Sequence, residues 1–132
     1  MAGKKAAIIK GENRKDNIKR CLTLIQEDLK PISEAKNILI KPNLVALKPD
    51  FANTHVETIE AVIEFIREIV PQTPITVGEA SASAFYNGIP TKEVFKDFDY
   101  NRLPDKYKNI TLTDFDNDKE FIHSTIHSIV GD

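Results

Sequence analysis

The chain is 132 residues long, the usual length of one domain, and its 41% hydrophobic and 29% charged residues permit a packed core without any sign of disorder. Its 18 basic and 20 acidic residues are mixed along the chain, so the net charge of −2 excludes the basic surface that would bind nucleic acid or an anionic membrane. We therefore expect one α/β domain over 1–132, or the N-terminal portion of a larger family domain.

The start of the chain and its cysteine content bear on location and cofactors. Residues 1–5 do not lead into the continuous apolar segment of a signal peptide, and no apolar run approaches the roughly 18 residues that cross a bilayer. We therefore expect a cytoplasmic protein. The single cysteine, Cys21, cannot form an internal disulfide or hold a four-cysteine cluster, and its apolar neighbours at helical spacing predict a core position.

Short apolar runs alternate with a helical pattern in the first forty residues. Residues 6–9 (AAII) predict a first buried strand. An apolar stripe then recurs at steps of three, four and seven, which predicts a helix from Arg14 that Pro31 stops. Residues 37–40 (NILI) have no alternation, which is typical of a strand covered on both faces in a parallel sheet.

The same alternation continues to residue 84. A second apolar stripe between Ile59 and Val70 predicts an amphipathic helix, opposed by a charged face and ended by Pro71. Residues 74–79 predict a third strand, and the small residues 80–84 predict a loop.

The last third is less regular. Residues 91–98 predict a short helix, 101–109 an exposed loop and 110–113 a fourth strand. Residues 121–130 are ambiguous, although their β-branched content favours a strand. His123 and His127 would share a metal only on a helix, so a metal site there is a minor alternative.

Strands that alternate with helices produce a parallel sheet, because each right-handed crossover needs a helix to return the chain. The predicted fold is therefore α/β, with an open, mainly parallel sheet and helices on its faces in a Rossmann-like three-layer arrangement. In such sheets ligands bind beyond the carboxyl ends of the strands, so the residues that follow each apolar run are the candidates for a site.

Lys41 and Asn43 follow the strand at 37–40, on either side of Pro42, which stiffens the turn. An ammonium beside an amide suits a carboxylate or a phosphate group. The alternative is that Lys41 extends into solvent and Asn43 caps a turn.

A second candidate lies at the start of the helix that follows. Thr54 and Glu57 have the spacing of a capping box, which makes His55 the first helical residue. The positive end of the helix dipole disfavours the imidazolium there, so the neutral ring of His55 could act as a base or a ligand. The alternative is an ordinary surface histidine.

The strand at 74–79 ends in Gly78 and Glu79. Gly78 lets the backbone bend or a ligand approach, Glu79 supplies a carboxylate, and the small residues that include Ser81 can turn backbone N–H groups toward an anion. The chain contains neither G-x-G-x-x-G nor G-x-x-x-x-G-K-[ST], so neither standard nucleotide-binding loop is predicted.

These motifs together resemble the family called domain of unknown function 362. The match lies on Lys41, Pro42 and Asn43, on Thr54, on Gly78 and Glu79, and on the PTKEVF segment at 90–95. The resemblance implies an α/β fold and no particular reaction. Some longer relatives carry ferredoxin-like iron–sulfur segments, but Cys21 alone cannot ligate such a cluster, so that cofactor is not expected within this chain.

Members of the family also continue into a second half with a Lys-Thr-His type segment, which these 132 residues do not contain. We therefore expect a truncated or a short member. A site shared between the two halves would then be incomplete.

Two hypotheses of function follow, and neither decides whether the chain is an enzyme. In the first, an enzyme-like α/β domain binds a small anion or a metal ion of unknown identity: Lys41, Asn43, Gly78 and Ser81 contact the ligand, while His55 and Glu79 are the catalytic acid–base candidates. In the second, the chain is a non-catalytic interaction module that forms a homo-oligomer or binds a protein partner through a free sheet edge. A redox role rests on the resemblance alone and is opposed by the cysteine count.

Overall fold

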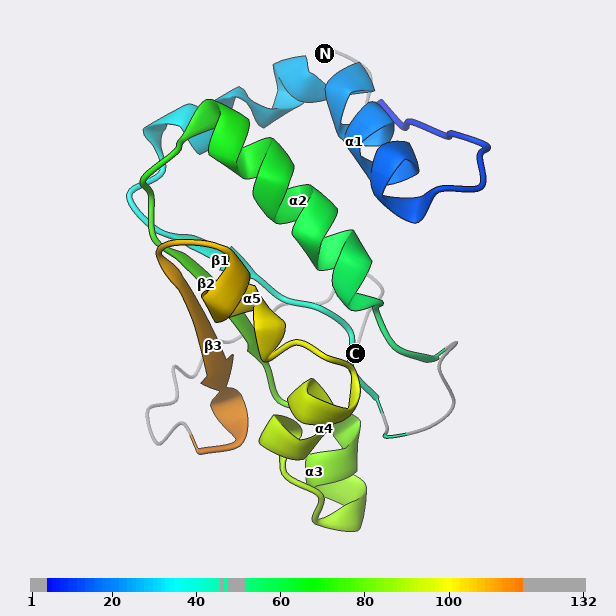
Figure 1. The fold of residues 1–132 in the computed structure, drawn as a ribbon, viewed down its shortest axis with the longest axis vertical. Coiled ribbons are helices and arrows are strands. Elements are labelled where there is room, and N and C mark those ends of the chain that lie inside the picture. Colours follow the sequence, from blue (N-terminus) through cyan, green and yellow to red (C-terminus); the bar gives the residue numbers. More distant parts are fainter. Residues whose placement is uncertain (1–4, 46, 48–51, 118–132) are drawn as a thin grey trace, which may run out of the picture.

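The computed structural model describes residues 5–45, 47 and 52–117 (Figure 1). In chain order the elements are α1 (Arg14–Leu24), η1 (Gln26–Glu34), β1 (Ile38–Ile40), α2 (Val56–Ile69), β2 (Ile75–Glu79), α3 (Ala82–Asn87), α4 (Thr91–Asp97), α5 (Arg102–Lys106), β3 (Ile110–Asp114) and η3 (Phe115–Asn117), where η denotes a 3₁₀ helix. None of the helices within these ranges is long and apolar enough to span a membrane.

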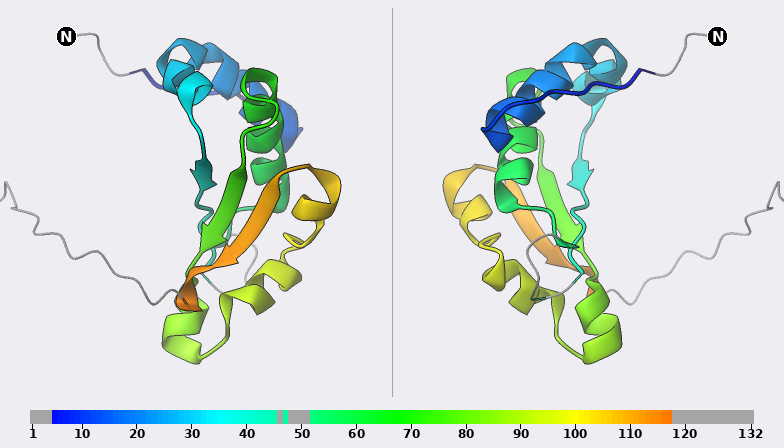
Figure 2. Two further views of the ribbon diagram at one scale, coloured as in Figure 1. Left: turned by 90° about the vertical axis from the view of Figure 1, so that its left-hand side faces the viewer. Right: turned by 90° about the vertical axis from the view of Figure 1, so that its right-hand side faces the viewer.

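The three strands form one parallel sheet in the order β1-β2-β3. The order in the sheet is the same as the order in the sequence. Right-handed crossovers between such strands place both connecting segments on the same face of the sheet. Figure 2 accordingly shows α2, α4 and α5 on one side of the strands. The predicted α/β fold with an open parallel sheet is confirmed.

The register of the sheet separates a covered face from an open one. Ile38, Ile75 and Ile110 lie in one row that belongs to the core, where they pack with apolar residues of α2, α4 and α5. The next row holds Leu39, Thr76 and Thr111 and lies on the opposite face, because side chains alternate along a strand. Leu39 is 59% exposed, so the prediction that this strand is covered on both faces is wrong at that residue. The three-layer arrangement stays a prediction.

Helix α2 is the centre of the packing. Its apolar stripe buries Ile59, Ile63 and Ile66 in the core, while α1 packs against it (Figure 1). At its last turn, Arg67 donates to the carbonyl oxygens of Thr73, at 2.6 Å, and of Lys108, at 2.8 Å. One side chain thus joins the two loops that lead into β2 and β3.

Two predictions for the first third of the chain are wrong. Residues 6–9 form no strand, and Ile8 is 91% exposed. The short apolar run did not reveal whether a neighbouring strand would pair with it. Pro31 does not end the helical region either, since it lies inside η1. Its fixed φ is compatible with a 3₁₀ turn, and the lost donor removes a single hydrogen bond.

Two predicted loops are short helices. Within 80–84, Ser81 is the N-cap of α3, which ends at Gly88 with φ 66°. Within 101–109, α5 buries only Leu103, so it has no periodic apolar stripe that the sequence could show. The predicted helix at 91–98 and the strands at 37–40, 74–79 and 110–113 are confirmed as α4, β1, β2 and β3.

Three further predictions concern the C-terminal segment and Cys21. The strand predicted at 121–130 and the pair His123 and His127 lie outside the described residues. Cys21, predicted in the core, is half-buried, with its thiol 3.8 Å from the carbonyl oxygen of Ala7.

Candidate functional site

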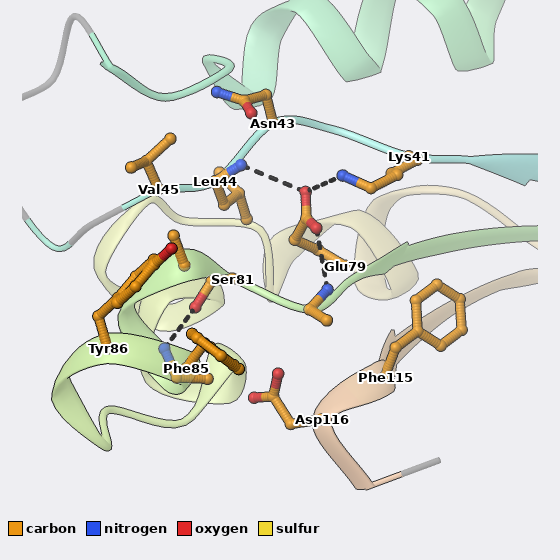
Figure 3. Close-up of a pocket in the computed structure, with 13 residues that line it drawn as sticks. Lys41, Asn43, Leu44, Val45, Glu79, Ser81, Phe85, Tyr86, Phe115 and Asp116 are labelled. Carbon is orange, nitrogen blue, oxygen red and sulfur yellow. Dashed lines mark hydrogen bonds and ion pairs between the residues drawn. The ribbon is translucent and has the colours of Figure 1, made fainter. Parts of the chain in front are cut away.

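A cavity of about 720 Å³ opens at the carboxyl ends of β1 and β2. Because the strands are parallel, the residues that follow them meet at this edge of the sheet, together with α3 and η3 (Figure 3). The lining residues are Lys41, Asn43, Leu44, Val45, Glu79, Ala80, Ser81, Ala82, Ala84, Phe85, Tyr86, Phe115 and Asp116. Lys41, Asn43, Glu79 and Ser81, four of the six candidates named from the sequence, therefore share one cavity.

The carboxylate of Glu79 is the most enclosed charged group of this cavity. Its side chain is 3% exposed, and Oε2 lies 2.7 Å from the ammonium of Lys41. The backbone N–H of Leu44 donates to the same oxygen at 3.3 Å, and the N–H of Ala80 donates to Oε1 at 2.9 Å (Figure 3). Glu79 thus connects the two strand exits, since Leu44 follows β1 and Ala80 follows β2.

The ammonium of Lys41 is in a different environment from its partner. Its side chain is 61% exposed, although Nζ also donates to the carbonyl oxygen of Pro42 at 3.3 Å. A lysine has three donor protons on a flexible stem. Lys41 can therefore contact Glu79 and a group inside the cavity at once.

Asn43 holds the turn after β1. Its side-chain Nδ2 donates to the carbonyl oxygen of Ala52 at 2.9 Å, and its backbone N–H donates to the hydroxyl of Thr54 at 3.0 Å. The side chain of Asn43 thus bonds to Ala52, nine residues along the chain, rather than to its own backbone as a local turn cap would, and Asn43 also lines the cavity.

The capping box predicted for α2 is wrong. The hydroxyl of Thr54 accepts from Asn43 rather than from the helix, Glu57 pairs with Arg14 at 2.8 Å, and His55 is itself the N-cap, without a side-chain cap bond. The tertiary contact with the turn after β1 has replaced the local one. His55 is not among the residues that line the cavity, so the structure does not bring it together with Glu79.

Ser81 belongs to a chain of hydrogen bonds that fixes the floor of the cavity. Its N–H donates to the hydroxyl of Thr91 at 2.6 Å, and its own hydroxyl accepts from the N–H of Ala84 at 3.3 Å. The N–H of Thr91 in turn donates to Asp116 at 2.8 Å.

Burial, together with the negative charge of Asp116, raises the pKa of the neighbouring Asp114.

Gly78 does not line the cavity itself but makes room for Phe115, which does. A Cβ on Gly78 would collide with the ring of Phe115. The absence of a side chain therefore lets Phe115 lie across the sheet, and Phe115 lines the cavity while Gly78 does not.

Tyr100 supports the site from the core. It is fully buried, and its hydroxyl donates to the carbonyl oxygen of Thr54 at 2.7 Å. Burial raises the pKa of Tyr100, and the negative charge of Glu79 raises it further. The phenol therefore stays protonated and fixes Thr54, whose hydroxyl accepts the hydrogen bond from Asn43.

The sequence did not single out the apolar part of the cavity, which Val45, Phe85, Tyr86 and Phe115 form. Two adjacent aromatic residues after a run of small ones were the available signal. For metal binding, no group of three or more His, Cys, Asp or Glu side chains comes together in the described ranges of the chain.

The parallel sheet and the position of the cavity define an α/β protein with a candidate ligand site at the strand exits. The model of the family "Domain of unknown function (DUF362)" matches residues 38–130, most of the 132 residues, and the chain belongs to this family. The matched region contains all three strands and the candidates Lys41, Asn43 and Glu79. Searches of curated proteins and of solved structures found no match.

Proposed function

We propose that the cavity at the strand exits binds a small ligand with an anionic group, and that Lys41 holds this group. One observation carries the proposal: the ammonium of Lys41, whose side chain is 61% exposed, lies 2.7 Å from an almost fully buried carboxylate on the wall of a cavity. Open α/β sheets bind their ligands at this edge. Membership of the family supports the fold and leaves the ligand open.

The hydrogen bonds of Glu79 allow Lys41 to turn toward a ligand. A buried carboxylate that lost its cation would be costly unless other donors remained. Glu79 keeps the N–H groups of Leu44 and Ala80, so it remains hydrogen-bonded if Lys41 shifts. The same pair of residues places a carboxylate beside the bound anion, and Glu79 is the acid–base candidate if a reaction takes place there. His55 has no part in this proposal.

Thermal unfolding in the presence of ligands tests the proposal. Small carboxylates, inorganic phosphate and divalent cations are titrated separately, because a compound that binds only the folded chain raises the midpoint, by about 2.7 kcal/mol of stability at a hundred times its Kd. We expect a carboxylate or phosphate to raise the midpoint of the native chain and to lose this effect in Lys41→Met. Identical midpoints with and without every compound would contradict the proposal.

Lys106→Met is the matched control. Lys106 also pairs with a glutamate whose side chain is 3% exposed, Glu60, at 2.8 Å, but it lies on α5 and does not line the cavity. The control therefore removes the same charge from a partner of an equally buried glutamate, outside the cavity. We expect it to keep the ligand effect.

A second candidate function is self-association, which the open sheet face favours. Leu39 is 59% exposed on that face, and β1 and β3 are the edge strands of the described sheet, so a second copy offers complementary free edges. Light scattering at high concentration is the test. A strict monomer would eliminate this candidate.

A further inference from the structure

Exposed apolar side chains gather at the same cavity. Phe85 is 83% and Tyr86 78% exposed, and their rings meet edge to face with centroids 4.9 Å apart. Val45, which is 38% exposed, lines the cavity with them. Large apolar side chains left in water beside a cavity are typical of a binding surface, whereas isolated ones need no explanation.

The charged residues that line the cavity limit the negative charge that a bound ligand can carry. Among the described residues that line the cavity, Lys41 is the only one with a cationic side chain, whereas Glu79 and Asp116 both contribute carboxylates. A phosphate dianion would meet two like charges and one opposite charge, which is unfavourable in a partly enclosed site. A single negative charge is repelled less by the two carboxylates than a dianion is, and it can still pair with the ammonium of Lys41.

Lys41 and the aromatic pair Phe85 and Tyr86 lie apart in the cavity. Figure 3 shows Lys41 and Tyr86 on opposite sides of the cavity, with Leu44 and Ser81 between them. The cavity volume of about 720 Å³ lies within the range of sites for small organic molecules. A ligand that contacts both walls must carry its charge at one end and an apolar group at the other.

We propose that the ligand is an organic monocarboxylate with a planar apolar group: its carboxylate pairs with Lys41 and its apolar group packs on Phe85 and Tyr86. This inference rests on the proposed anion site at Lys41. Tyr and Phe faces favour flat groups because aromatic pairs gain from edge-to-face or offset contact beyond the area that they bury. A nucleoside monophosphate also joins a planar group to an anion, but it brings the second charge that Glu79 and Asp116 disfavour.

Backbone NMR titrations of the ¹⁵N-labelled chain with acetate, phenylacetate and adenosine monophosphate form the test, because they detect weak binding and locate it. We expect phenylacetate to shift the amide signals of Leu44 and Ala80 and to bind at least about tenfold more tightly than acetate, which corresponds to about 1.4 kcal/mol. Adenosine monophosphate should bind more weakly than phenylacetate.

Variants separate the two ends of the ligand. Phe85→Ala combined with Tyr86→Ala should remove most of the advantage of phenylacetate and leave acetate binding unchanged, while Lys41→Met should weaken both compounds. The two aromatic side chains are mainly exposed, so an unchanged thermal midpoint is expected to show that the double variant is folded.

The outcomes distinguish this inference from the proposed function. If acetate and phenylacetate bind equally through Lys41, the inference is overturned and the anion site stands. Tighter binding of adenosine monophosphate than of phenylacetate overturns the choice of a monocarboxylate. If none of the three compounds shifts the cavity amides, both proposals fail.

Discussion

Two glutamates among the described residues are almost fully buried, and their surroundings differ. The side chains of Glu60 and Glu79 are each 3% exposed. Glu60, on α2, is contacted by three cations from α1 and the α5 helix: Lys15 at 3.4 Å, Arg102 at 3.1 Å and Lys106 at 2.8 Å. Glu79 has one cation, Lys41, and takes its remaining hydrogen bonds from backbone N–H groups.

The difference separates a structural ion-pair network from a candidate site. At Glu60 the cations bridge α1, α2 and α5, and against the opposing effect of burial the hydrogen bonds and charges of Arg102 and Lys106 hold the pKa of Glu60 below its usual value. At Glu79 the single cation faces a cavity and can be shared. Burial of a carboxylate alone therefore does not indicate function, whereas burial beside one exposed cation at a strand exit is the more informative combination.

The largest effect expected from this comparison is on stability at Glu60. Glu60→Gln removes the charge that three cations share and should lower the free energy of unfolding by about 2–3 kcal/mol, less than for a fully buried pair because those cations are partly exposed. Urea unfolding at pH 7 measures the change. If Glu60→Gln lost less free energy of unfolding than Glu79→Gln, Glu60 would not be the more structural of the two glutamates.

Glu64 extends the same network and predicts a pH dependence. Lys15, Lys19 and the hydroxyl of Tyr107 outweigh burial and lower the pKa of Glu64 to about 2, from a usual value of 4.5. Since the folded-state pKa is the lower one, its stabilisation is present above pH 4.5 and is lost as the pH falls toward 2. The side chain is a quarter exposed, so we expect about 2 kcal/mol to be lost over this range.

Unfolding curves between pH 5 and 2 test this dependence, with Glu64→Gln as the comparison. The variant should be less stable at pH 5 and should lose less stability on acidification. Parallel curves for the native chain and the variant would show that Glu64 does not carry the effect.

Glu79→Gln should cost less stability than Glu60→Gln. It removes one charge-assisted contact and keeps an acceptor for one of the two backbone donors, so about 1 kcal/mol is expected. Carboxylate binding should persist, because the amide no longer competes for Lys41. Loss of binding together with unchanged stability would assign to Glu79 a direct contact with the ligand.

The smallest change in stability is expected for the two lysines. Lys41→Met and Lys106→Met each remove one partly exposed partner of a buried glutamate and should lower stability by about 1 kcal/mol or less. They should differ in ligand binding alone. Calorimetric titration with a carboxylate compares them, and equal loss in both variants would place binding outside the cavity.

Much of this architecture follows from periodicity. The strands β1, β2 and β3 and the helices α2 and α4 were visible because each has an apolar run or stripe that joins the core or packs against it. The segment at 6–9 has the composition of a strand but no pairing partner among the described strands, and α5 has a single buried residue. Pairing and short helices depend on tertiary contacts that local composition does not encode.

The polar half of the site was predictable for a geometric reason. Parallel strands bring their exits to one edge, so Lys41, Asn43, Glu79 and Ser81 could be grouped before any coordinates. His55 was misplaced because its position depended on Thr54 capping α2, and Thr54 bonds to Asn43 instead. Phe85 and Tyr86 were missed because the predicted loop ended at residue 84 and no element was predicted for them, and exposure of an aromatic side chain is a property of the folded surface.

The most direct test of the central claim is a crystal structure of the chain with phenylacetate. We predict the carboxylate within hydrogen-bonding distance of Lys41 Nζ, with Glu79 still bonded to the N–H groups of Leu44 and Ala80. A carboxylate bound elsewhere while Lys41 contacts Glu79 alone would contradict the claim that this lysine is the anion-binding group.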